Sequence, residues 1–146
     1  MFNLCLLLSR DLCVLPVVDV LHQAIDGGAD LIQLREKEMA PQEFCEYAAP
    51  LIEICKNQGV KIVINDSVEC AMALGADGVH LGQEDMPVRL ARKLLGPDKL
   101  IGLSTHSVEQ AEDAVCSGAD YIGFGPIFPT PTKGCLKGLG PEQLIV

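Results

Sequence analysis

Short apolar runs alternate with helical patterns along the chain, and this alternation limits the possible folds more than any other feature. Six continuous apolar runs are candidate strands, at residues 4–8, 31–34, 61–64, 78–81, 100–103 and 121–124. Such runs are typical of strands buried on both faces of a parallel sheet. Five segments with apolar residues at helical spacing lie between them, at 17–25, 41–57, 68–74, 87–95 and 108–117. Alternating βα units predict an α/β fold, with a parallel sheet and helices outside it.

The tripeptide Gly-Ala-Asp occurs three times, each time between a candidate helix and a candidate strand. The copies begin at Gly28, Gly75 and Gly118. Glycine is common just after a helix because it adopts the left-handed conformation that ends many helices. We therefore expect the repeated part to be scaffold, on the stability face of the fold. Its aspartates are expected to be turn residues: Asp30, Asp77 and Asp120.

Length and composition predict a single cytoplasmic domain, residues 1–146, with an aliphatic core. Of its residues 49% are hydrophobic but only 4% are aromatic. No apolar run approaches the ~20 residues needed to span a bilayer. The formal net charge of −9 argues against nucleic acid as a partner, because phosphate backbones select basic surfaces. Seven cysteines without a C-x-x-C pair favour reduced, buried thiols.

Polar residues follow each candidate strand from the second to the sixth, where parallel α/β folds bind ligands. Gln33, Arg35 and Lys37 alternate along one strand end, so we expect their side chains on one side of it. Two cations and an amide suit a phosphate or diphosphate. The alternative is a polar strand end that simply enters solvent.

The segment PTPTK, residues 129–133, is a weaker indication of phosphate binding. It offers the hydroxyls of Thr130 and Thr132, followed by Lys133. Ser104 and His106 stand close together after the fifth candidate strand, but no G-x-S-x-G motif or suitable acid accompanies them. The sequence therefore predicts no covalent nucleophile.

Two acidic residues, Asp66 and Asp85, follow the third and fourth candidate strands. Neighbouring strands lie roughly 5 Å apart, so both carboxylates can reach one hard cation. Mg²⁺ typically takes one or two carboxylates together with phosphate oxygens and water. In the alternative, Asp85 caps the helix that holds Pro87 and Asp66 fixes a turn. The spacing alone leaves both possibilities open.

At these residues the sequence resembles the thiamine phosphate synthase family. The segments LIQLREK, VINDSVECAMALGADGVHLGQED, IGLSTHS and GADYIGFGPIFPTPTK are similar to the family's successive signature loops, in the family's order. The resemblance covers essentially the whole chain. It implies a (β/α)₈ TIM barrel that joins a hydroxymethylpyrimidine diphosphate to a thiazole phosphate, giving thiamine phosphate and pyrophosphate.

The resemblance also implies roles for individual residues, carried over by position. Those that would hold the pyrimidine diphosphate are Gln33, Arg35, Lys37, Asn65 and Lys133, with Ser104 lining the pyrimidine site. Those that would contact the thiazole phosphate are Thr130, Pro131 and Thr132, and those that would bind Mg²⁺ are Asp66 and Asp85. Catalysis would rest on positioning and electrostatics.

The family's barrel has eight strands, whereas this sequence offers six candidates. We therefore expect a barrel without its last two βα units, as part of a longer protein or completed by another chain, a homo-oligomer being one such form. Two rival hypotheses are a thiazole tautomerase-like relative, with His106 transferring protons, and a non-catalytic fragment that binds phosphate ligands.

Overall fold

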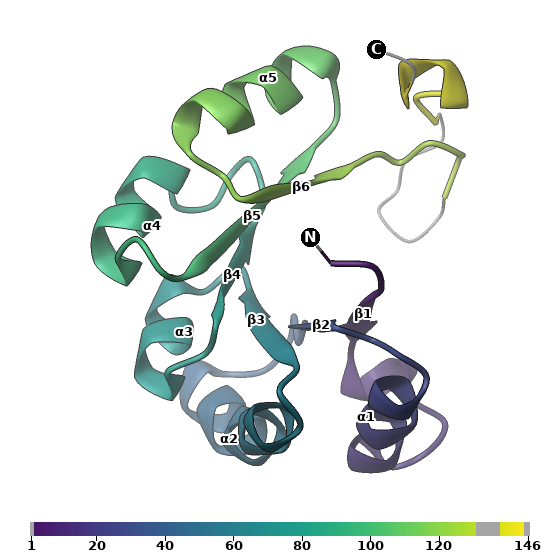
Figure 1. Ribbon diagram of the computed structural model, residues 1–146, viewed down its shortest axis with the longest axis vertical. Coiled ribbons are helices and arrows are strands. Elements are labelled where there is room, and N and C mark those ends of the chain that lie inside the picture. The colour runs from purple at the N-terminus through teal and green to yellow at the C-terminus, as the bar shows by residue number, and fades with distance from the viewer. Residues whose placement is uncertain (1, 131–137, 145–146) are drawn as a thin grey trace. The chain divides into compact units, whose positions relative to one another are not determined.

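The computed structural model describes residues 2–130 and 138–144 of an alternating β/α chain (Figure 1). The chain forms two compact units, Met1–His80 and Leu81–Val146. The first contains β1 (Cys5–Leu8), η1 (Arg10–Leu12), α1 (Val17–Asp26), β2 (Leu31–Leu34), α2 (Pro41–Gln58), β3 (Lys61–Asn65), α3 (Val68–Leu74) and most of β4 (Gly78–Leu81). The second contains α4 (Val88–Leu95), β5 (Leu100–Thr105), α5 (Val108–Ser117), β6 (Tyr121–Phe124) and η2 (Pro141–Leu144).

The strands pair in parallel within each unit. β1 pairs with β2, β2 with β3 and β3 with β4, and in the second unit β5 pairs with β6. The register aligns Leu8, Leu34 and Ile64 across the first three strands. Loops that follow these strands therefore leave from one edge of the sheet. The predicted α/β fold with six parallel strands is confirmed for the described residues.

The core of the first unit lies between its strands and α2. The apolar side chains of β2 and β3 are almost fully buried, and so is the inner face of α2 at Ala48, Leu51, Ile52 and Cys55. Figure 1 shows α2 and α3 as neighbours, and both pack against β3. Burying a large aliphatic side chain stabilises a fold by about 1.5–3 kcal/mol, so this aliphatic core suffices with few aromatic residues.

The three Gly-Ala-Asp aspartates do more than turn the chain. In each copy the aspartate N–H donates to a main-chain carbonyl at the start of the preceding strand. Its carboxylate accepts the N–H of that same residue. The pairs are Asp30 with Leu4 (3.1 and 3.0 Å), Asp77 with Ile62 (2.8 and 3.0 Å) and Asp120 with Ile101 (2.8 and 2.7 Å). We call each of these reciprocal pairs an aspartate clamp.

The clamps join the two strands of successive βαβ units, β1 with β2, β3 with β4 and β5 with β6. Two of them carry an ion pair as well: Lys61 lies 2.7 Å from Asp77, and Arg92 lies 2.6 Å from Asp120. The main-chain N–H groups of Asn3 and Leu4 hold the pKa of Asp30 below its usual range. The repeat is thus a register device at the amino ends of the strands.

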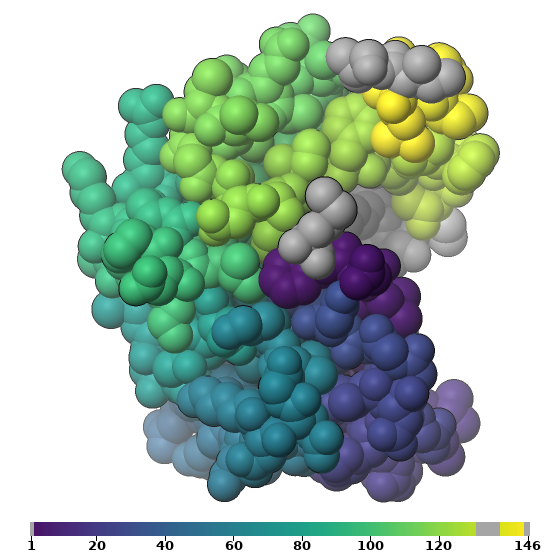
Figure 2. Space-filling view, in the orientation of Figure 1, coloured from purple at the N-terminus to yellow at the C-terminus, as the bar shows by residue number. Residues whose placement is uncertain are grey.

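The cysteines are less buried than the sequence suggested. Six described cysteines are free thiols, and of these only Cys55 and Cys70 are buried. Cys5 and Cys116 are exposed, so the expectation of buried thiols is wrong for these two. Figure 2 shows the first described residues of the chain, dark purple, at the surface of this face. None of the helices in the described ranges is long and apolar enough to cross a membrane.

Candidate functional site

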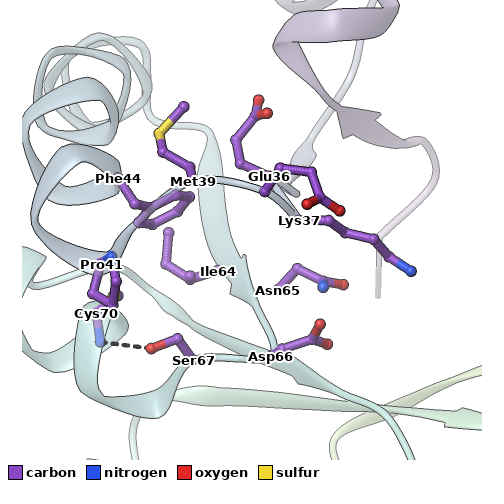
Figure 3. Close-up of a pocket in the computed structure, with 11 residues that line it drawn as sticks. Glu36, Lys37, Met39, Pro41, Phe44, Ile64, Asn65, Asp66, Ser67 and Cys70 are labelled. Carbon is purple, nitrogen blue, oxygen red and sulfur yellow. Dashed lines mark hydrogen bonds between the residues drawn. The ribbon is translucent and has the colours of Figure 1, made fainter.

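A cavity of about 420 Å³ lies in the first unit, where β2 and β3 end (Figure 3). Its lining comes from the loop after β2, the start of α2 and the junction of β3 with α3: Glu36, Lys37, Glu38, Met39, Pro41, Phe44, Ile64, Asn65, Asp66, Ser67 and Cys70. Figure 3 shows Lys37, Asn65 and Asp66 extending to the same side. The cavity therefore combines an apolar wall from α2 with a polar, charged side.

Asp66 has an unusual backbone for a residue with a side chain. Its φ angle is 65°, and no other non-glycine residue in the described ranges has a positive φ. The Asp66 N–H donates to the carbonyl oxygen of His80 in β4 at 2.8 Å. The Ser67 N–H donates to that of Asn65, also at 2.8 Å, which closes a three-residue turn. Such backbone strain gathers at functional sites, so this exposed carboxylate is a strong candidate for binding.

Of the alternating residues Gln33, Arg35 and Lys37, only Lys37 lines this cavity. Lys37 lines it, whereas Gln33 lies within β2 and is 5% exposed. Arg35 is not among the lining residues, but its main chain is well fixed. Its N–H donates to the carbonyl of Leu8 at 2.9 Å, and its carbonyl accepts the hydroxyl of Ser9. The first strand therefore holds the loop that carries both cations.

Glu36 is a supporting residue that the sequence analysis did not identify. Its Oε1 accepts the Arg10 N–H at 2.6 Å, which ties η1 to the loop after β2. The Arg10 guanidinium lies over the Tyr47 ring, 5.6 Å from its centre. Burial raises the pKa of Tyr47 above its usual range, and the Glu36 carboxylate adds to that shift. The sequence signal for this role was the position of Glu36 between Arg35 and Lys37, where alternation predicts a side chain on the opposite side of the strand end.

Asp85 closes a turn rather than capping a helix. The α4 helix has Pro87 as its N-cap, with no side-chain cap bond, so the capping alternative is wrong. Asp85 Oδ2 instead accepts the Gly82 N–H at 2.6 Å. A side chain at Gly82 would place its Cβ only 3.0 Å from that oxygen. Glycine therefore lets the main chain approach and orient the carboxylate.

Gln83 connects this turn to Ser104 and was also missed. Its Nε2 donates to the main-chain carbonyl of Ser104, near the end of β5, at 2.6 Å. The contact links the loop after β4 to the carboxyl end of β5 within the second unit. No pattern in the sequence distinguishes this glutamine from a surface residue, because the partner is a main-chain atom 21 residues away.

The predicted phosphate loop is described only at its start. Thr130 is half-buried, while Pro131, Thr132 and Lys133 lie outside the described residues. Asp66 belongs to the first unit and Asp85 to the second. No group of three or more histidine, cysteine or acidic side chains within residues 2–130 and 138–144 could hold a metal ion. The donor atoms on offer are carboxylate and amide oxygens, which suit a hard cation that keeps ligands from substrate or water.

Comparison with known proteins identifies the family. The family model described as "Thiamine monophosphate synthase" matches residues 4–145. The chain belongs to the thiamine monophosphate synthase family. The resemblance noted in the sequence is therefore confirmed across nearly the whole chain.

Relatives of this thiamine monophosphate synthase family member occur in bacteria, plants and archaea. The thiamine-phosphate synthase of Chlorobium luteolum is 48% identical over 97% of the chain and 66% of its own length. The chloroplastic thiamine biosynthetic bifunctional enzyme TH1 of Arabidopsis thaliana is 54% identical over 88% of the chain and 24% of its own. The solved thiamine phosphate pyrophosphorylase of Pyrococcus furiosus superposes with a TM-score of 0.86 at 36% identity, covering 98% of this chain and 67% of that one. The chain thus spans less than two thirds of either curated relative.

Proposed function

We propose that this chain, as one domain spanning residues 1–146, binds a pyrimidine diphosphate at the carboxyl ends of its strands. In the whole protein, that substrate would condense with a thiazole phosphate to give thiamine phosphate and pyrophosphate. The observation that carries the proposal is the cavity at which Lys37, Asn65 and Asp66 extend to one side (Figure 3). The names of the family and of its relatives, which are thiamine phosphate synthases and a thiamine phosphate pyrophosphorylase, fit a reaction that gives thiamine phosphate and pyrophosphate.

The diphosphate is the part of the substrate that these residues suit best. Lys37 supplies an exposed ammonium group at the cavity, and Asn65 supplies an amide next to it. Arg35 precedes Lys37 by two residues on a loop whose main chain is fixed by β1. Gln33, buried in β2, would offer its amide from beneath. Ionised donors form stronger hydrogen bonds to phosphate oxygens than neutral ones, so the two cations would provide most of the affinity.

Asp66 and Asp85 are the residues we propose for Mg²⁺. Both stand at the ends of neighbouring strands in the sequence order, and each is held by main-chain hydrogen bonds. Two carboxylates are too few to enclose the ion, which fits a magnesium site completed by diphosphate oxygens and water. When bound, Mg²⁺ would neutralise part of the charge on the diphosphate.

The chemistry of this chain's own residues would be electrostatic. As the bond between the pyrimidine methylene carbon and the diphosphate breaks, negative charge develops on the leaving pyrophosphate. Arg35, Lys37 and Lys133 would stabilise that charge, and no protein nucleophile is required. Ser104 would line the pyrimidine site, fixed through its carbonyl by Gln83. Thr130, Pro131 and Thr132 would contact the thiazole phosphate.

Titration calorimetry with inorganic pyrophosphate, with and without Mg²⁺, tests the diphosphate site on the chain itself. Lys37→Gln should weaken Mg²⁺-dependent binding about tenfold or more, because a hydrogen bond to a charged group contributes about 1.5–3 kcal/mol. Lys93→Gln, the same change on the exposed side of α4, should leave binding unchanged. Equal affinities for the two variants would contradict the proposed diphosphate site. Formation of thiamine phosphate from both substrates, followed by fluorescence, tests the whole reaction.

A further inference from the structure

Two cysteines meet where α2 packs against α3, beside the cavity. Cys70 lies in the first turn of α3, is 7% exposed, and donates its main-chain N–H to the Ser67 hydroxyl at 3.1 Å. Cys70 and Pro41 line the same cavity (Figure 3). Cys45 follows Pro41 by one helical turn, and residues four apart share a face of a helix. Cys45 therefore lies on the face of α2 that is turned toward α3.

A hydrogen bond links the side chains of Cys45 and Cys70 across the packed helices α2 and α3. Burial raises the pKa of Cys45, and the neighbouring Cys70 side chain adds to that shift. Cys45 is half-buried whereas Cys70 is buried, so a small molecule reaches the first more easily than the second.

We propose that Cys45 and Cys70 form a redox modification site, at which a small-molecule disulfide such as oxidised glutathione converts both thiols into one intrachain disulfide. The Cys45 thiolate attacks the small disulfide, forms a mixed disulfide and releases one glutathione thiolate. Cys70 then loses its proton and attacks the Cys45 sulfur, which displaces the second glutathione. The protein gives up two electrons and two protons, and one glutathione disulfide becomes two glutathione thiols.

The position of the pair gives the bond a structural consequence. Cys70 follows Ser67, the N-cap of α3, by three residues, and Ser67 follows Asp66 directly. A disulfide from Cys70 to α2 would join the two helices that flank the cavity on one side. It would also anchor the turn that carries Asp66. The proposal itself stands on the packing of α2 against α3 and on the hydrogen bond between the two side chains, and it does not depend on the substrate.

Peptide mapping of the full chain after equilibration with glutathione redox buffers tests this site. The reduced protein is incubated at graded ratios of oxidised to reduced glutathione, quenched in acid, alkylated and digested without reductant. We expect a peptide joining Cys45 to Cys70, an intact mass lower by two hydrogen atoms, and full reversal by excess reduced glutathione. Cys55→Ser should still form the bond, whereas Cys45→Ser should carry at most a glutathione adduct.

Two results would overturn the proposal. One is complete alkylation of both cysteines in the wild-type chain at the most oxidising ratio, with no linked peptide. The other is a linked peptide that joins either residue to a different cysteine, Cys135 included. Because the wild-type chain alone decides between these results, a variant that fails to fold does not affect the test. The outcome is also independent of pyrophosphate binding, so failure here and failure of the proposed function are distinguishable.

Discussion

The two ends of the strands use aspartate in opposite ways. At the amino ends, the aspartate clamps direct their carboxylates back into main-chain N–H groups of the neighbouring strand. At the carboxyl end of β3, Asp66 instead stands exposed at a cavity, in a turn with a positive φ angle, whereas Asp85 after β4 accepts the Gly82 N–H within its own turn. We propose that the same side chain serves the fold at the amino ends and binds ligand at the carboxyl end of β3. On this proposal, the tripeptide before the strands is repeated because its role is structural, while the residues after the strands differ because each contacts a different part of the ligands.

The largest loss of stability is expected from substitution of Asp77, in the second aspartate clamp. Asp77→Ala removes the acceptor of the Ile62 N–H and the partner of Lys61. Leaving a part-buried donor unsatisfied costs about 1–3 kcal/mol, so we expect a loss of about 2 kcal/mol in unfolding free energy. Urea unfolding measures this, with Asp26→Ala, an exposed aspartate at the end of α1, as the matched control. A change within the error of the control would show that the clamp does not hold the fold.

A smaller effect is expected at Asp30, where the clamp is exposed and acts through pH. Hydrogen bonds from the N–H groups of Asn3 and Leu4 lower the pKa of Asp30 in the folded protein. Its stabilising contribution is therefore present above the unfolded pKa of ~3.9 and is lost as pH falls through the lower, folded value. Asp30→Asn should therefore reduce the loss of stability at acid pH. Thermal unfolding measured from about pH 2 to about pH 6, a range that brackets the unfolded pKa of ~3.9, tests this. An unchanged acid slope would argue against those hydrogen bonds.

The smallest change in free energy is expected from substitution of Gln83, which joins the loop after β4 to the carboxyl end of β5. Gln83→Ala removes one side-chain hydrogen bond to the Ser104 carbonyl. Such a bond contributes about 0.5–1.5 kcal/mol, so we expect the affinity for a pyrimidine diphosphate to fall by a few-fold. Unfolding free energy should fall by no more than about 1 kcal/mol, because Gln83 is exposed. Gln83→Glu, which cannot donate, should behave like the alanine variant, whereas retained affinity in both would remove Gln83 from the site.

Much of this architecture could be predicted from the sequence, because apolar periodicity reports burial directly. The predicted bounds of α3, α5, β2, β4 and β6 agree with the structure, and β5 runs two residues further, to Thr105. The family resemblance followed from contiguous loop motifs. Helix capping by Asp85 was the clearest wrong alternative, since Pro87 takes the cap position and Gly82 takes the carboxylate.

The clamps and the supporting contacts could not be predicted, because each joins residues far apart in the sequence through a main-chain atom. Asp77 reads as a turn residue until Ile62 is seen beside it, 15 residues earlier in the chain. The left-handed turn at Asp66 has no sequence signature beyond an Asn-Asp pair. Local patterns specify elements and their order, whereas contacts to main-chain groups depend on strand register.

The central claim is that aspartates before the strands hold the fold while aspartates after them bind ligand, and one paired measurement tests it directly. Unfolding free energy and Mg²⁺-dependent pyrophosphate affinity are measured for Asp77→Asn and Asp66→Asn; asparagine keeps the size of each side chain and tolerates the φ of 65° at Asp66. We predict that Asp77→Asn loses stability but keeps its affinity, and that Asp66→Asn keeps its stability but loses at least about tenfold in affinity. The reverse pattern, or equal losses in both variants, would contradict the account.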